Sequence, residues 1–316
     1  MRTTLKLLVA ALLLIAGLIA GLAASAWAPD LPVAQLTARW ATLPSRFLPL
    51  EGMQVHLRDE GPRDDSLPVV LLHGTGASLH TWEAWATELR ATRRVIRMDL
   101  PAFGLTGPFP DGNYSMPHYV RFLTHLLDTL GVKRFVIIGN SFGGELAWRT
   151  TLVLPGRVAQ LVLVDASSFA SSPTAIPIGF RLARVTWLAP LLRNVLPRRV
   201  IEQSVKSVYG DTTRVTDETV ARYADLTRRE GNRTALTQRI QQSVPGKGTD
   251  QLRTIAAPTL ILWGRKDRLI PVENAEKLHA AIAGSTVVVF DELGHVPQEE
   301  DPARSFAPVR TFLRIP

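Results

Sequence analysis

Three polar residues, each placed directly after an apolar run, have the types needed for nucleophilic catalysis. Ser141 lies between Gly139 and Gly143 in "IIGNSFGG", Asp267 follows "PTLILWG", and His295 follows "STVVVFDELG". A serine hydroxyl becomes a strong nucleophile when an imidazole takes its proton, and a carboxylate orients that imidazole. The chain order serine, aspartate, histidine therefore predicts a nucleophile, an acid and a base acting together.

The two glycines around Ser141 indicate how its hydroxyl is presented. A strand turns this abruptly into a helix only where no Cβ atom blocks their approach, so the serine sits on a strained turn above the sheet. A tight glycine turn with an idle serine is the alternative, and the presence of Asp267 and His295 argues against it. Asp165, after "QLVLV", also follows a predicted strand and is the second candidate for the acid.

The elements that must position these residues alternate between strands and helices. Apolar runs predict strands at "PVVLL", "RVIRM", "RFVIIG", "QLVLV", "TLILWG" and "TVVVF", and amphipathic segments between most of them predict helices. This alternation predicts an α/β fold with a mostly parallel central sheet flanked by helices. Because parallel strands end at the same edge, Ser141, Asp267 and His295 are expected to meet there.

A helical tract at about residues 168–250 interrupts the rhythm of strands and helices. We interpret it as a cap inserted over the carboxyl ends of the strands, where open α/β sheets bind their ligands. Within it, residues 176–200 combine apolar side chains with arginines, a composition that fits either pocket lining or a helix at a membrane surface. Both interpretations predict a pocket for apolar acyl or alkyl groups, and therefore a small apolar ester or related acyl substrate.

The first 28 residues predict a transmembrane helix that anchors the protein. Arg2 and Lys6 precede an uncharged apolar stretch from Leu7 to Ala28, and about 20 apolar residues span a bilayer. Because basic residues stay in the cytoplasm, the catalytic domain is expected on the extracytoplasmic, periplasmic side. The alternative is a signal peptide cleaved near "AASAWA", which would give a secreted protein.

The remaining chain divides into a linker at residues 29–45 and a catalytic domain at residues 46–316. Its 316 residues, 46% of them hydrophobic, suffice for a large core. The net charge of +8 comes without a nucleic-acid-binding motif, so contact with anionic lipid headgroups is the expected use of the positive charge. The chain has no cysteine and no histidines at metal-ligand spacing, so neither a metal nor a cofactor is expected.

From residue 46 onward the chain resembles the α/β-hydrolase fold enzymes. The motifs "HGTG", "DLPAFGLTG", "GNSFGG", "WGRKD" and "GHVPQ" follow the order and spacing of that family. The resemblance implies Ser141 as nucleophile, His295 as base and Asp267 as acid. It also implies an oxyanion hole formed by the backbone N–H groups of Thr75 and Phe142.

The serine at position 141 also limits which reactions of this family are expected. A serine nucleophile implies acyl transfer, and our first expectation is hydrolysis of carboxylic esters of apolar substrates. The alternative is cleavage of carbon–carbon bonds in ring-fission products, as in the meta-cleavage-product hydrolases that "GNSFGG" resembles. Those relatives commonly carry Trp after the catalytic histidine, where this chain has Val296. A non-catalytic binding protein on the same fold is the third possibility, disfavoured because the triad is complete.

Overall fold

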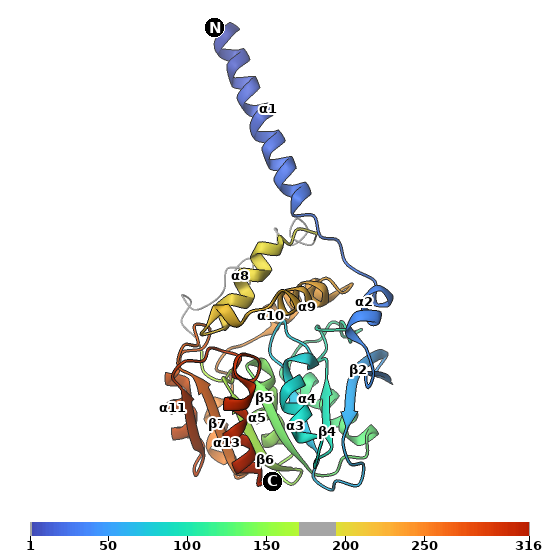
Figure 1. Ribbon diagram of the computed structural model, residues 1–316, viewed down its shortest axis with the longest axis vertical. Helices are drawn as coiled ribbons and strands as arrows, with labels where there is room; N and C mark the ends of the chain where they lie inside the picture. Colours follow the sequence, from blue (N-terminus) through green and yellow to red (C-terminus); the bar gives the residue numbers. More distant parts are fainter. Residues whose placement is uncertain (1, 171–193, 316) are drawn as a thin grey trace.

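The computed structural model describes residues 2–170 and 194–315, and its centre is an eight-stranded sheet (Figure 1). The strand order is β1-β2-β4-β3-β5-β6-β7-β8. β2 pairs antiparallel with β1 and with β4, and the pairs from β4 through β3, β5, β6 and β7 to β8 are parallel. The predicted mostly parallel sheet is confirmed. The strands are β1 (Arg46–Leu50), β2 (Met53–Glu60), β3 (Val69–Leu72), β4 (Val95–Met98), β5 (Phe135–Asn140), β6 (Val158–Val164), β7 (Thr259–Gly264) and β8 (Thr286–Phe290).

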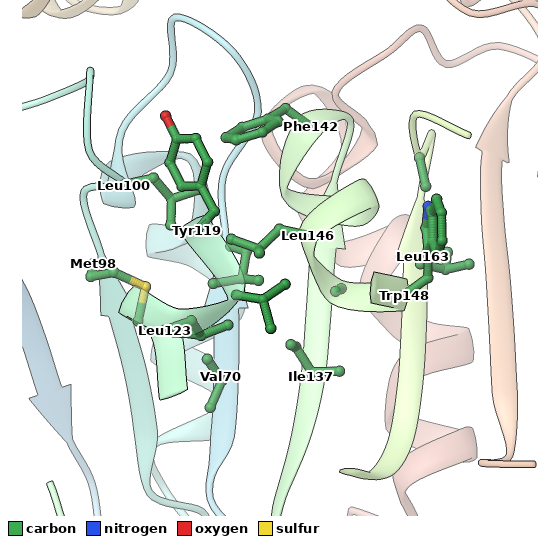
Figure 2. Packing of buried hydrophobic residues seen from close by; sticks show 14 of the residues in the cluster. Val70, Met98, Leu100, Tyr119, Leu123, Ile137, Phe142, Leu146, Trp148 and Leu163 are labelled. Atoms are coloured by element: carbon green, nitrogen blue, oxygen red, sulfur yellow. The ribbon is translucent and has the colours of Figure 1, made fainter. Parts of the chain in front are cut away.

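Helices cover both faces of this sheet, which explains why its strands are continuous apolar runs. Along β3, Val70 and Leu72 pack in one core cluster with α4, α5 and α11, whereas Val69 and Leu71 pack in a second with α3 and α13. Figure 2 shows the first cluster, where Tyr119 and Phe142 meet above the strands. The helices that connect or follow the strands of the sheet, apart from the cap, are η1 (Leu79–Trp82), α3 (Glu83–Leu89), α4 (Met116–Thr129), α5 (Phe142–Val153), α11 (Glu273–Ala281), α12 (Pro297–Glu300) and α13 (Pro302–Leu313).

A group of helices between β6 and β7 lies over the carboxyl edge of the sheet (Figure 1). They fall within the tract predicted as a cap: α8 (Arg198–Val208), η4 (Thr212–Arg214), α9 (Asp217–Thr227), α10 (Asn232–Gln242) and η5 (Thr249–Thr254). Residues 171–193, which hold most of the apolar and arginine-rich segment, lie outside the described residues.

The N-terminal prediction needs a correction. Helix α1 (Arg2–Ser25) extends away from the sheet and cap (Figure 1). A spanning helix requires about 20 successive apolar residues, and in the described parts of the chain no helix has the length and apolar character to cross a membrane. The predicted transmembrane helix is therefore wrong, and so is the membrane-anchored, extracytoplasmic location that depended on it.

The segment predicted as a linker contains α2 (Val33–Trp40) and is bonded to the cap. The N–H of Leu31 donates to the carbonyl of Arg228 at 2.6 Å, and the Asp30 carboxylate accepts from Arg233. The segment therefore joins α2 to the turn between α9 and α10.

Candidate active site

Ser141 is the single residue between β5 and α5. Its φ of 55° and ψ of −119° lie in a region that residues with a side chain rarely adopt. A Cβ atom on Gly139 would lie 2.2 Å from the carbonyl oxygen of Gly143, and one on Gly143 would lie 2.2 Å from that of Leu72. Strand and helix therefore meet this closely only because both positions are glycine, which places Ser141 at the start of α5.

His295 and Asp267 form a buried hydrogen-bonded pair at the same edge. His295 Nδ1 lies 2.7 Å from Asp267 Oδ2, and the other carboxylate oxygen accepts from the N–H groups of Leu269 at 2.7 Å and Ile270 at 3.0 Å. Three donors thus hold the Asp267 carboxylate in place. Asp165 lies nearby, but the acceptor for His295 Nδ1 is Asp267, which favours Asp267 as the acid.

Asn140 connects the serine turn to the histidine loop, a role that the sequence analysis missed. Its Nδ2 donates to the carbonyl of His295 at 2.9 Å and to that of Val164 at 3.1 Å. The bond to His295 joins the two loops one residue from Ser141. The available signal was a polar residue at the end of a buried apolar strand, which must find hydrogen-bond partners.

The loop after β3, which holds the predicted oxyanion-hole residue Thr75, lies against Ser141. A Cβ atom on Gly74 would lie 3.0 Å from the Ser141 Cβ. The fully buried His73 supports the loop: its Nδ1 lies 2.8 Å from the Gly74 carbonyl, while its Nε2 accepts from the N–H of Leu100 at 2.9 Å. Burial lowers the pKa of His73, consistent with a neutral ring. Phe142 begins α5, where the first N–H groups lack partners within the helix.

Arg239, from cap helix α10, contacts both residues predicted to form the oxyanion hole. Its Nη2 donates to Thr75 Oγ1 at 2.6 Å, and its guanidinium carbon lies 4.1 Å from the centre of the Phe142 ring. Among the described residues, the Nε atom is shielded from solvent without a hydrogen-bond partner, and no carboxylate forms an ion pair with Arg239. The Glu145 carboxylate attracts the guanidinium from a longer distance but is hydrogen-bonded to Arg149. Burial lowers the pKa of this guanidinium. The place of Arg239 beside Thr75 and Phe142 depends on tertiary contacts. No local sequence pattern therefore distinguished Arg239 from the other arginines of the cap.

A small pocket lies beside the loop after β3. Core loops form one wall and the α9–α10 turn forms the other. Asn232, from α10, lines this mostly apolar pocket and is buried, and its Oδ1 has no hydrogen-bond partner among the described residues. The lining residues are Gly76, Ala77, Ala102, Phe103, Gly104, Leu226, Thr227, Asn232 and Leu236.

Comparison with known proteins gives the family of this chain. The family model described as alpha/beta hydrolase fold matches residues 68–302. The chain is 32% identical to the 2-hydroxy-6-oxo-2,4-heptadienoate hydrolase of Pseudomonas putida, over 83% of this chain and 93% of the relative.

Two solved structures extend the comparison. The meta-cleavage product hydrolase of Pseudomonas fluorescens is 26% identical with a TM-score of 0.72, covering 85% of this chain and 97% of its own. The thermophilic esterase of Thermogutta terrifontis is 28% identical with a TM-score of 0.69, at the same coverages. The family model and the sequence relative confirm the predicted resemblance: the chain is a member of the α/β-hydrolase fold family.

Proposed function

We propose that this protein cleaves a bond to a carbonyl carbon through an acyl-enzyme on Ser141. The observation that carries the proposal is the strained turn at Ser141, which lies at the same edge of the sheet as the pair of His295 and Asp267. In this pair, Nδ1 of His295 lies 2.7 Å from Oδ2 of Asp267. His295 takes the proton of the attacking hydroxyl, and Asp267 stabilises the resulting imidazolium. The N–H groups of Thr75 and Phe142 bind the oxyanion, and His295 then protonates the leaving group before water releases the acyl group.

The first candidate reaction is cleavage of a carbon–carbon bond beside a carbonyl group. It is supported by the relative named for a 2-hydroxy-6-oxo-dienoate, a substrate that carries a carboxylate. Arg239 fits such a substrate, because its partly buried guanidinium has no carboxylate partner among the described residues and lies against Thr75 and Phe142. A substrate carboxylate would add a direct ion pair to the longer-range attraction from Glu145.

Ester hydrolysis, our first expectation from the sequence, is the second candidate. Val296 is buried in a cluster with Val205 and Tyr209 of the α8 region, so the residue after His295 packs against the cap. The related carbon–carbon hydrolases commonly have Trp at that position. The structural likeness to an esterase also supports this candidate.

The test combines active-site labelling with two substrate classes. A fluorophosphonate probe is expected to label the wild type and the surface variant Ser204→Ala, but not Ser141→Ala. Turnover of 2-hydroxy-6-oxo-2,4-heptadienoate is compared with that of p-nitrophenyl esters of increasing acyl length. Higher kcat/KM on the dienoate supports carbon–carbon cleavage, and turnover of the esters alone supports the second candidate. A folded wild type that neither reacts with the probe nor turns over either class would refute the proposal in favour of a binding protein.

A further inference from the structure

A second buried carboxyl group, that of Asp165, lies beside the triad acid and has no part in the mechanism above. Asp165 directly follows β6, is fully buried, and adopts a φ of 44°. One of its oxygens, one oxygen of Asp267 and one ring nitrogen of His295 all lie within 4.8 Å of one another. A non-glycine residue at positive φ costs free energy that the surrounding structure must compensate. Its position next to Asp267 suggests what the strained conformation achieves.

The hydrogen bonds of the two carboxyl groups differ. Asp267 accepts from two backbone N–H groups and faces His295 Nδ1. Asp165 accepts from one donor, the N–H of Gly264 at 2.9 Å, and its Oδ2 is buried with no donor among the described residues. Two adjacent buried carboxyl groups do not both ionise without a large cost. The three donors assign the negative charge to Asp267 and leave the proton on Asp165.

We propose that Asp165 is held as a neutral carboxylic acid whose hydroxyl donates to the Asp267 carboxylate, so that Asp165 is a positioning residue for the triad. The inference rests on the proposed function for the role of Asp267. The ionisable groups around Asp165 agree with it: burial, the charge of Asp267 and that of Glu300 all raise the pKa of Asp165, and only the Gly264 N–H opposes them. His295, the remaining ionisable group, is bonded to Asp267.

This hydrogen bond would set the basicity of His295. A donor to Asp267 withdraws part of the negative charge that stabilises the imidazolium. Without the donor, Asp267 stabilises the protonated, charged ring of His295 more strongly. Since the base must be neutral to act, the acidic limb of the kcat/KM profile would then move to higher pH.

The experiment compares Asp165→Asn, which keeps a neutral donor, with Asp165→Ala, which removes it. Asp165→Asn is expected to keep kcat/KM within about threefold and to leave the acidic limb in place. Asp165→Ala is expected to lower kcat/KM about tenfold and to move the limb up by about one pH unit. Asp291→Asn, at an exposed aspartate, is the matched control and should change neither. Infrared difference spectra should show a protonated carboxylic acid in the wild type that is missing in Asp165→Asn.

Three results would overturn the inference: the infrared band is absent from the wild type, Asp165→Asn loses activity as Asp267→Asn does, or Asp165→Ala is active with an unmoved limb. If Asp165→Ala does not fold, the infrared band of the wild type and the activity of Asp165→Asn still test the inference. Failure of the proposed function would show separately, as absent labelling of Ser141, and would leave the infrared result valid.

Discussion

The backbone N–H of His295 donates to the carbonyl of Val208 at 2.7 Å, so the histidine loop is hydrogen-bonded to the last residue of cap helix α8. Glu300 strengthens the connection by accepting from the N–H groups of Gly294 at 2.8 Å and Gly210 at 3.0 Å. A movement of the cap at this end would therefore displace His295.

Glu299 anchors the cap to the helix that follows His295. Its side chain, 7% exposed, accepts from Arg222 at 2.8 Å, Tyr209 at 2.9 Å and Tyr223 at 3.2 Å. Burial opposes ionisation of this carboxyl, but Arg222 and the hydroxyl donors outweigh it and lower its pKa. Glu299→Gln is expected to lower the free energy of unfolding by about 3 to 5 kcal/mol, because Arg222 loses its buried counter-charge.

The control for this variant is Glu292→Gln, which breaks an exposed pair with Lys266. Glu292→Gln is expected to lower the free energy of unfolding by less than about 1 kcal/mol. Urea unfolding of both variants measures the difference. Equal losses would show that the buried cap contact is no stronger than an exposed pair.

Arg239→Gln tests whether the guanidinium recognises an anionic substrate. Hydrogen bonds to charged groups contribute about 1.5 to 3 kcal/mol, so kcat/KM for the dienoate is expected to fall roughly 10-fold to 100-fold. Neutral p-nitrophenyl esters are expected to lose much less, and Arg253→Gln, at an exposed arginine, should affect neither class. An equal loss on both classes would instead indicate that Arg239 supports the loop that holds Thr75.

His80 should make stability depend on pH. Burial is the main reason why its pKa falls from 6.5 to about 4. The neutral ring fits its surroundings, with Nε2 lying 2.9 Å from the Trp40 carbonyl and Nδ1 lying 3.0 Å from the Ser78 hydroxyl. Because the unfolded chain binds the proton more readily, the contribution of neutral His80 is complete above pH 6.5 and is lost as the pH falls toward 4.

The measurement is urea unfolding of the wild type and His80→Asn at pH 7 and at pH 5. The wild type is expected to lose more stability on acidification than the variant does. Identical losses would assign the acid sensitivity to other groups.

Gly143→Ala tests the packing behind the serine turn. The new methyl group would lie 2.2 Å from the Leu72 carbonyl oxygen, a backbone atom that cannot move aside. We expect Gly143→Ala to lower the free energy of unfolding by about 3 kcal/mol or more, or to prevent folding. Gly156→Ala, where nothing lies within 4 Å, is the control and should change the free energy of unfolding by less than about 1 kcal/mol. Thermal unfolding compares them, and a Gly143→Ala protein as stable as the control would contradict the packing argument.

The sequence by itself predicted the α/β fold and named Ser141, Asp267 and His295. These predictions were possible because they depend on local features: apolar runs at strand length, glycines at a tight turn, and polar residues directly after a strand. A parallel sheet brings such strand ends to one edge, so the topology alone places the candidates near one another.

Only the tertiary structure decided which side chains meet at that edge. The contacts of Asn140 with His295 and of Arg239 with Thr75 join residues more than 150 positions apart, and nothing local to either residue specifies its partner. For the same reason the sequence left both Asp165 and Asp267 as candidates for the acid, and the hydrogen bond to His295 supports Asp267. Residue type and spacing are properties of a short segment, whereas burial, hydrogen-bond partners and the charge of a buried group depend on what the rest of the chain packs around it.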